Sequence, residues 1–319
     1  MDETNRFDLI TMTEEIFKLI EQISDKKISD QYKARIKKYF KKNQDNLKRK
    51  NYLRELERKV KHDAIYYDLL NRIQQHFADD KMLLEEVIQE FNRGKYVYFY
   101  KKGNSQPFQN LLNYKTFGKY QLIHDDFRKV KIAHESVDLI ITDPPYPKQY
   151  LPLYEDLSIF AEKILKPGGS LFMMVGQSYL PEVLQLMERK KLKYNWMLSY
   201  YTPGGQSPQI WPRKVNTFWK PVLWYIKGKP DFWIGDVIKS KVNDNDKRFH
   251  YWGQSESGMF DLISKVSYVG QIIVDPFMGG GSTGIIAKKL RRDFIGIEID
   301  EKSFKIAKTR MEKGNSINL

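Results

Sequence analysis

A short stretch that ends in Asp143-Pro144-Pro145-Tyr146 constrains the fold of this chain most strongly. The preceding residues, 137–142, are mostly β-branched and apolar, which predicts a buried strand. The two prolines cannot continue a hydrogen-bonded ladder, so the strand ends at the carboxylate. In α/β sheets, ligands bind at the carboxyl ends of strands. A stiff turn without chemistry explains this stretch alone equally well.

A second stretch, far away in the sequence, also reads as a strand followed by a loop. Residues 271–275 predict a strand, a helix is expected over 285–290, and residues 294–298 predict another strand that ends in an acid. Glycines in the intervening loop allow the backbone to approach a ligand, and the acid can bind a ribose diol. The residues expected to bind a cofactor here are Asp275, Phe277, Gly279, Gly281, Thr283 and Glu298.

The glycine spacing alone has a second interpretation. Gly279, Gly281 and Gly284 also fit a dinucleotide site, which would make the chain a nicotinamide-dependent oxidoreductase. A P-loop is excluded, because no Lys follows the last glycine. The oxidoreductase hypothesis leaves the Asp-Pro-Pro-Tyr motif unexplained.

With the Asp-Pro-Pro-Tyr motif before the glycine loop, the chain resembles the β class of S-adenosylmethionine-dependent amino-methyltransferases of the DNA adenine type. The resemblance covers roughly residues 119–312. It implies that Asp143, Pro144, Pro145 and Tyr146 are catalytic and that S-adenosylmethionine binds at the glycine loop. Asp143 and the Pro144 carbonyl would hold the two amino hydrogens of a flipped adenine, and Tyr146 would stack on the base.

The resemblance also implies cofactor contacts outside the two motifs. Asp125, at the end of a strand, would accept a hydrogen bond from the cofactor adenine, although Asp126 competes for this role and either acid could simply cap the strand end. Where the family has a His-Pro-Thr-Gln-Lys-Pro pattern, this chain retains only His250 and, less closely, Gln254 and Ser255. These three residues would lie at the methionine carboxylate of the cofactor.

The alternation of expected strands and helices after residue 119 favours a doubly wound, mostly parallel Rossmann-like sheet with helices on both faces. Residues 1–94 are expected to form a helical basic domain for DNA binding or oligomerisation. Residues 95–118 form the expected linker, with a short strand over 96–100. Two long segments within the methyltransferase domain, 202–219 and 227–252, correspond to the target-recognition region of the family.

The net charge of +14 favours a polyanionic partner. From Lys33 to Lys61 there are thirteen basic residues and three acidic ones, a net charge of +10. This run could contact phosphates, or it could be a solvated helix face. Several tryptophans of the recognition loops could likewise be packing anchors. The residues expected to contact double-stranded DNA are Lys37, Lys38, Lys41, Lys42, Lys48, Arg49, Lys50, Trp211, Arg213 and Lys214.

The absence of Cys excludes disulfides, Cys-ligated zinc and a thiol nucleophile, and it disfavours methylation of cytosine carbon 5. No metal is expected. The start has no basic n-region, and no apolar run approaches the ~20 residues that span a bilayer. A cytoplasmic protein without membrane contact is therefore expected, associated with the nucleoid of a bacterial, phage or archaeal system.

The sequence therefore predicts an enzyme that transfers a methyl group from S-adenosylmethionine to the 6-amino group of adenine in DNA. Methylation of the 4-amino group of cytosine, or of adenine in RNA, stays open as an alternative. An oxidoreductase or a non-catalytic nucleic-acid binder is a weaker alternative. The recognition sequence, a paired restriction enzyme and the oligomeric state, with a homodimer as one option, stay open.

Overall fold

The computed structural model describes residues 3–204, 209–230, 232–242 and 255–313. The chain divides into two compact units, Met1–Leu112 and Asn113–Leu319. The helical domain was expected to end at residue 94, but the first unit extends to Leu112. Most of the expected linker, residues 95–118, therefore belongs to the first unit.

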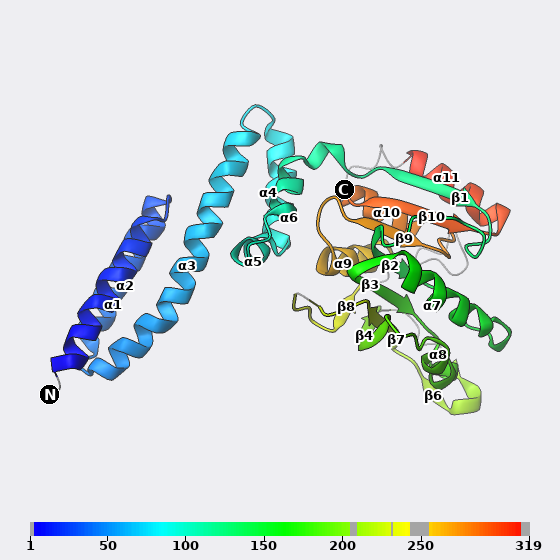
Figure 1. The fold of residues 1–319 in the computed structure, drawn as a ribbon, viewed down its shortest axis with the longest axis horizontal. Coiled ribbons are helices and arrows are strands. Elements are labelled where there is room, and N and C mark those ends of the chain that lie inside the picture. Colours follow the sequence, from blue (N-terminus) through cyan, green and yellow to red (C-terminus); the bar gives the residue numbers. More distant parts are fainter. Residues whose placement is uncertain (1–2, 205–208, 231, 243–254, 314–319) are drawn as a thin grey trace. The chain divides into compact units, whose positions relative to one another are not determined.

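The first unit is helical throughout its described regular structure (Figure 1). Aspartates begin three of its helices, because their carboxylates accept hydrogen bonds from otherwise unpaired backbone N–H groups. Asp25, Asp45 and Asp80 play this part for α2, α3 and α4. The helices are α1 (Glu3–Glu21), α2 (Lys26–Lys42), α3 (Asn46–His76), α4 (Lys81–Arg93), α5 (Tyr96–Lys101) and α6 (Gln106–Leu112).

The first three helices share one apolar core. Ile20 of α1, Ile36 of α2 and Leu53 of α3 are almost completely buried in it. The rings of Tyr39 and Tyr52 stack at a centroid distance of 3.9 Å and connect α2 to α3. Because these helices bury their apolar faces against one another, their charged faces point outward.

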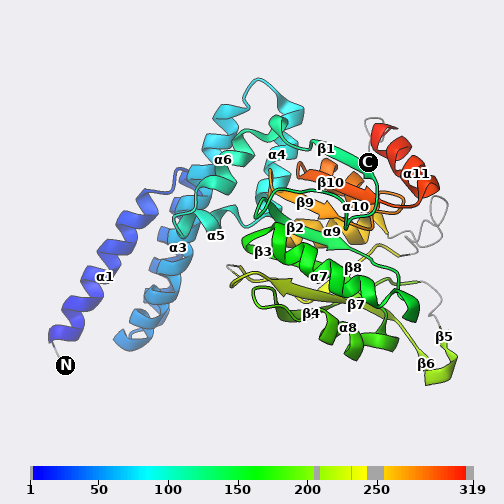
Figure 2. The same ribbon diagram turned by 45° about the vertical axis from the view of Figure 1, so that its right-hand side comes forward.

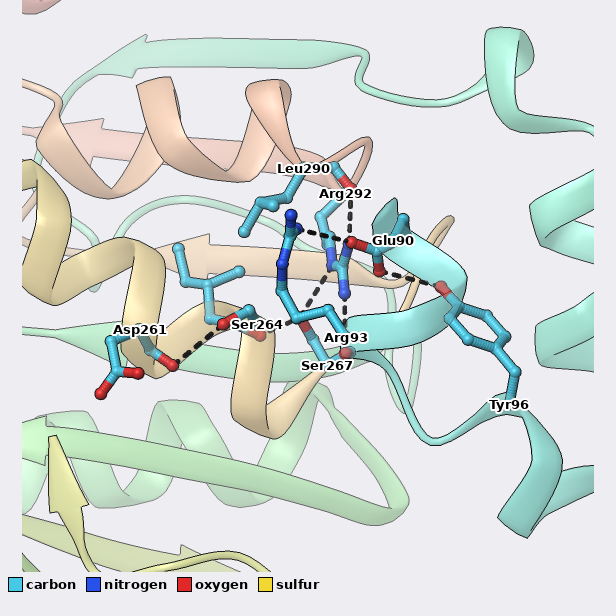
Figure 3. A network of polar contacts seen from close by, with 9 residues as sticks. Glu90, Arg93, Tyr96, Asp261, Ser264, Ser267, Leu290 and Arg292 are labelled. Atoms are coloured by element: carbon cyan, nitrogen blue, oxygen red, sulfur yellow. Dashed lines mark hydrogen bonds and ion pairs between the residues drawn. The ribbon is translucent and has the colours of Figure 1, made fainter. Parts of the chain in front are cut away.

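The short strand expected over residues 96–100 is wrong, because this segment is helix α5. Tyr96, Val97 and Phe99 are buried at helical spacing. The Tyr96 hydroxyl donates to the buried Glu90 carboxylate at 2.9 Å, and Glu90 also pairs with Arg93 (Figure 3). An aromatic run has a high β propensity, but a strand needs a neighbour for its backbone groups, and the described elements of this unit are all helices.

The second unit contains an eight-stranded sheet among its described residues, in the order β1-β10-β9-β2-β3-β7-β4-β8. Neighbouring strands are parallel except that β7 is antiparallel to β3 and β4. The strands are β1 (Tyr120–His124), β2 (Val137–Thr142), β3 (Leu165–Met174), β4 (Lys193–Tyr201), β7 (Trp219–Ile226), β8 (Val237–Lys239), β9 (Ile272–Asp275) and β10 (Asp293–Glu298). A separate hairpin pairs β5 (Gln209–Ile210) with β6 (Val215–Asn216).

Helices cover both faces of this sheet (Figure 1, Figure 2). Successive strand residues point to opposite faces, so Ile141 packs with α9, α10 and α11, whereas Ile140 packs with α7 and α8. The helices are α7 (Pro152–Ile164), α8 (Leu180–Leu186), α9 (Glu256–Val266), α10 (Ser282–Lys289) and α11 (Glu301–Lys313). The prediction of a doubly wound, mostly parallel sheet is confirmed.

A fully buried arginine, Arg292, connects the segment that follows α9 to the segment that follows α10. Arg292 donates from Nε to the Ser267 hydroxyl at 2.9 Å and from Nη2 to the Ser267 carbonyl at 2.7 Å (Figure 3). It also donates to the Leu290 carbonyl. A buried guanidinium needs such partners, because an unpaired charge in the interior is strongly unfavourable.

Candidate active site

The loops that follow β2 and β9 lie at the same edge of the sheet. The two strands are parallel neighbours, with Ile140 opposite Val274. The Thr142 hydroxyl donates to Asp275 Oδ1 at 2.7 Å, a buried hydrogen bond between residues 133 positions apart. The structure therefore brings together the Asp-Pro-Pro-Tyr motif and the glycine loop, at the point where the strand order reverses.

The Asp143 carboxylate is held by groups from its own loop and from β7. The Tyr146 hydroxyl donates to Asp143 Oδ1. Lys220 Nζ lies 3.8 Å from Asp143 Oδ2. Burial and the nearby Asp143 carboxylate raise the pKa of the Tyr146 hydroxyl well above its usual value. Tyr146 therefore stays a neutral hydrogen-bond donor at physiological pH.

The loop is packed tightly beneath Tyr146. A Cβ at Gly176, just after β3, would lie 3.1 Å from the Tyr146 Cβ. The Tyr154 hydroxyl of α7 donates to the Pro145 carbonyl at 3.4 Å. Pro144 is buried. These contacts and the fixed φ angles of the two prolines hold the loop in one conformation.

The glycine loop is organised by Glu298. Gly279 donates its N–H to Glu298 Oε2 and Asp300 donates to Oε1, both at 2.8 Å. Gly279 and Gly281 have φ angles of +50° and +83°, which side chains rarely adopt. A Cβ at Gly281 would also lie 3.1 Å from the Cβ of Ala307 in α11. The loop thus presents bare backbone before the N-terminus of α10.

Asp275 and Thr283 are buried between the Asp-Pro-Pro-Tyr loop and the glycine loop. Asp275 is 2% exposed, and burial raises its pKa to about 7. Hydrogen bonds from the hydroxyls of Thr142 and Thr283 and from the Phe277 amide oppose this increase without cancelling it. Asp275 therefore has a structural role, because its carboxylate is hydrogen-bonded to Thr142, just before the Asp-Pro-Pro-Tyr loop, and to Phe277 in the glycine loop.

This stretch of the chain matches a known family. The family model described as DNA methylase matches residues 137–262 and 254–309, which together exceed half of the chain.

The chain belongs to the DNA methylase family.

Individual relatives agree with this membership and support the family resemblance read from the sequence. The Type II methyltransferase M.HinfI of Haemophilus influenzae is 34% identical over 243 residues, covering 59% of this DNA methylase and 67% of the relative. The DNA adenine methyltransferase YhdJ of Escherichia coli strain K12 is 26% identical over 234 residues, covering 57% and 78%. The crystal structure of the M1.HpyAVI–SAM complex aligns with a TM-score of 0.50 and 25% identity, over 60% of this chain and 98% of that one.

The remaining cofactor residues predicted for the DNA methylase differ in their surroundings. Asp125 is exposed at the end of β1, beside Glu298, whose carbonyl accepts its N–H at 3.2 Å. Asp126 is buried and paired with Arg128, which lowers its pKa. Because Asp126 is occupied by Arg128, Asp125 is the more accessible of the two acids predicted to contact the cofactor adenine.

The residues predicted before α9 are only partly described. Ser255 is buried and caps α9 by accepting a hydrogen bond from the Gly258 amide at 3.1 Å. This capping bond gives Ser255 a structural role of its own. His250 and Gln254 lie outside the described residues.

The predicted DNA-contact residues of the first unit fall into two groups. We use the name basic arm for residues 33–61 of α2 and α3. Five of the lysines predicted to contact DNA are exposed in it: Lys37, Lys38, Lys41, Lys42 and Lys48. Arg49 instead closes the turn between the helices, with its guanidinium donating to the carbonyls of Phe40 and Asn43. Lys50 is partly buried.

The predicted contacts in the second unit lie on the β5–β6 hairpin. Trp211 is 78% exposed at its turn, and Arg213 and Lys214 are exposed beside it. Lys214 adopts a φ angle of +52°, which turns the chain sharply. The hairpin therefore presents an aromatic ring and two cations to solvent.

Lys220 is the site residue that sequence reasoning missed. Its position beside Asp143 depends on the antiparallel direction of β7, which places the start of that strand at the edge of the sheet where β2 ends. No local motif signals this direction.

Over the part of the chain that the structure describes, no helix is both long and apolar enough to cross a bilayer.

Proposed function

We propose that this DNA methylase transfers a methyl group from S-adenosylmethionine to the 6-amino group of adenine in double-stranded DNA. The observation that carries the proposal is the placement of Asp143. It follows the β2 residue that is hydrogen-bonded to Asp275, so Asp143 begins the loop that neighbours the glycine loop at the end of β9. An acceptor for an amino group and a backbone cradle for a cofactor therefore share one edge of the sheet.

The residues of the glycine loop fit S-adenosylmethionine. The open backbone at Gly279 and Gly281 leaves room for the cofactor, and the second lone pair on each Glu298 oxygen can accept a ribose hydroxyl. When bound, the cofactor supplies a methyl group whose bond to sulfur breaks as its bond to nitrogen forms, leaving a neutral thioether. The structure of M1.HpyAVI with this cofactor supports the assignment.

Asp143 makes the amino nitrogen of the base reactive. That nitrogen is a poor nucleophile, since its lone pair is delocalised into the ring. The Asp143 carboxylate accepts one amino hydrogen and the Pro144 carbonyl accepts the other, which localises the lone pair and aims it at the methyl carbon. The amino proton then leaves the methylated nitrogen for solvent. Asp143 also stabilises the positive charge that develops on nitrogen.

Tyr146 has two parts with separate roles. Its hydroxyl orients Asp143, and its ring provides a face for the flipped base. The flipped base needs a partner for its exposed faces once it leaves the duplex, and stacking on an aromatic ring supplies one.

Adenine is preferred over cytosine for two reasons. One relative, YhdJ, is named a DNA adenine methyltransferase. The chain also carries Asp at position 143, whereas the variant of the resembling family with Ser is associated with methylation of the cytosine amino group. The exposed lysines of the basic arm and the β5–β6 hairpin suit contact with the phosphates and bases of DNA.

The test is transfer of a labelled methyl group to duplex DNA, followed by nucleoside analysis. Label on adenine supports the proposal. Label on cytosine would overturn the adenine assignment and leave the amino-transfer mechanism intact. Label that appears only when RNA replaces DNA would overturn the assignment of the substrate.

A further inference from the structure

Lys220 reaches the catalytic edge from a strand that carries none of the recognised motifs. Because β7 runs antiparallel to β3 and β4, its first residues lie near the edge where the parallel strands end. Lys220 is the second residue of β7 and pairs with Tyr200 of β4. Its side chain is partly exposed, and Nζ lies 3.8 Å from Asp143 Oδ2.

Lys220 and Tyr146 flank the same carboxylate. The Tyr146 hydroxyl donates to Oδ1, and the Lys220 ammonium lies nearest to Oδ2. Lys220 Nζ is also 5.7 Å from the centroid of the Tyr146 ring, close enough for a favourable cation–π interaction. The three side chains therefore form one cluster in which each contacts the other two.

We propose that Lys220 is a positioning residue for methyl transfer. The terminal torsion of an Asp side chain is broad, so a carboxylate held from one side can rotate. A cation at one oxygen and a hydroxyl at the other restrict this rotation and keep the carboxylate in the orientation that accepts an amino hydrogen. The proposal rests on the proposed role of Asp143, because Lys220 acts through that carboxylate and does not touch the reacting atoms.

A purely structural role for Lys220 makes different predictions. If its aliphatic stem only packs against β4, a methionine should replace it without a loss in transfer rate. If its charge only attracts DNA, its removal should weaken DNA binding but leave the rate at saturating DNA unchanged. Positioning instead requires that the rate of the transfer step falls and that a second cation restores it.

The experiment compares Lys220→Met and Lys220→Arg in single-turnover methyl transfer, with DNA and cofactor saturating. We expect Lys220→Met to slow transfer about tenfold, on the scale of a small misplacement of a reacting group. We expect Lys220→Arg to stay within about threefold of the wild type, and both variants to bind cofactor within about twofold of it. Lys193→Met is the matched control, since Lys193 is an exposed lysine at the opposite end of the β4–β7 pair.

A double-mutant cycle tests whether Lys220 acts through Asp143. In an Asp143→Asn background, Lys220→Met should change the residual rate by less than about twofold, because the charge that it positions is gone. A wild-type rate for Lys220→Met, equal losses for Lys220→Met and Lys220→Arg, or the same tenfold loss in both backgrounds would each overturn the proposal. If Asp143→Asn itself is fully active, the proposed role of Asp143 fails. If Asp143→Asn is slow and Lys220→Met is fast, only the role of Lys220 fails.

Discussion

The edge of the sheet that carries Asp143 and the basic arm use charge in different ways. At the edge, Asp275 is buried and hydrogen-bonded, and Asp143 is flanked by a hydroxyl and an ammonium group. In the basic arm, five lysines point into solvent from α2 and the start of α3. Groups fixed in a low-dielectric site can favour one geometry, whereas exposed cations attract a polyanion with little geometric preference. Changes at the edge should therefore alter chemistry, and changes in the arm should alter salt-dependent binding.

The largest expected effect belongs to the basic arm. If it contributes to neutralising about six phosphates, DNA affinity should fall roughly a thousandfold between about 50 and 200 mM salt. Replacing Lys37, Lys38, Lys41, Lys42 and Lys48 by Gln should flatten this dependence without changing transfer at saturating DNA. Fluorescence anisotropy across a salt series measures the slopes. The control is Lys302→Gln with Lys308→Gln, two exposed lysines of α11. Equal slopes for the arm variant and the wild type would show that the arm does not contact the backbone of DNA.

Asp275 should make folding pH-dependent, unlike the exposed charges of the arm. Its pKa is raised by burial from 3.8 to about 7, so the folded protein binds this proton more tightly than the unfolded chain. Protonation of Asp275 therefore adds to the free energy of unfolding, on the order of 4 kcal/mol in all. This stabilisation is fully present below about pH 4 and is lost as the pH rises toward 7 and beyond. Asp275→Asn should remove this part of the dependence. Denaturant unfolding between pH 5 and 8, roughly spanning the folded pKa, measures it. Parallel curves for the two proteins would contradict the assignment.

Glu298 should matter for cofactor binding. Glu298→Ala removes the acceptor proposed for the ribose and the partner of the Gly279 amide, and it should weaken S-adenosylmethionine binding by roughly 1.5–3 kcal/mol. Glu298→Gln, which keeps one acceptor oxygen, should lose less. Isothermal titration gives both affinities. Unchanged binding to a folded Glu298→Ala protein would place the ribose elsewhere.

The smallest expected effect concerns the ring of Tyr146. Tyr146→Ala should weaken retention of the flipped base by roughly 1–3 kcal/mol, the scale of stacking on an aromatic side chain. Tyr146→Phe keeps the ring and loses only the hydrogen bond to Asp143, so base retention should be preserved while transfer slows. Fluorescence of 2-aminopurine at the target position reports the flipped base. The same loss of retention in both variants would argue against stacking.

The two motifs could be predicted from the sequence because each is local. Asp143 follows an apolar, β-branched run that predicts a buried strand, and the glycines before α10 predict a loop whose positive φ angles other residues rarely adopt. The placement of Lys220 could not be predicted, since it depends on which strands β7 pairs with and in which direction. Helix α5 was missed for a related reason: Tyr96 and Phe99 favour strands by propensity, but burial within an all-helical set of neighbours decided their conformation.

Arg49 shows the same limit in the basic arm. In the sequence it is one cation in a run, and its charge alone suggests contact with phosphate. In the structure its guanidinium donates to the carbonyls that end α2, at Phe40 and Asn43. Composition therefore predicts that a surface is basic, but only the fold shows which of its cations face solvent.

The claim that Asp143 acts in the transfer step is tested most directly by Asp143→Asn. Asn is nearly the same size, but it lacks the negative charge and can present a donor where the base also has one. We expect single-turnover transfer of labelled methyl to DNA to fall by at least about a hundredfold. Cofactor affinity, measured on the same preparation, should change much less, since the loss falls on the transition state. A wild-type transfer rate in Asp143→Asn would show that the Asp143 carboxylate does not act in the transfer step.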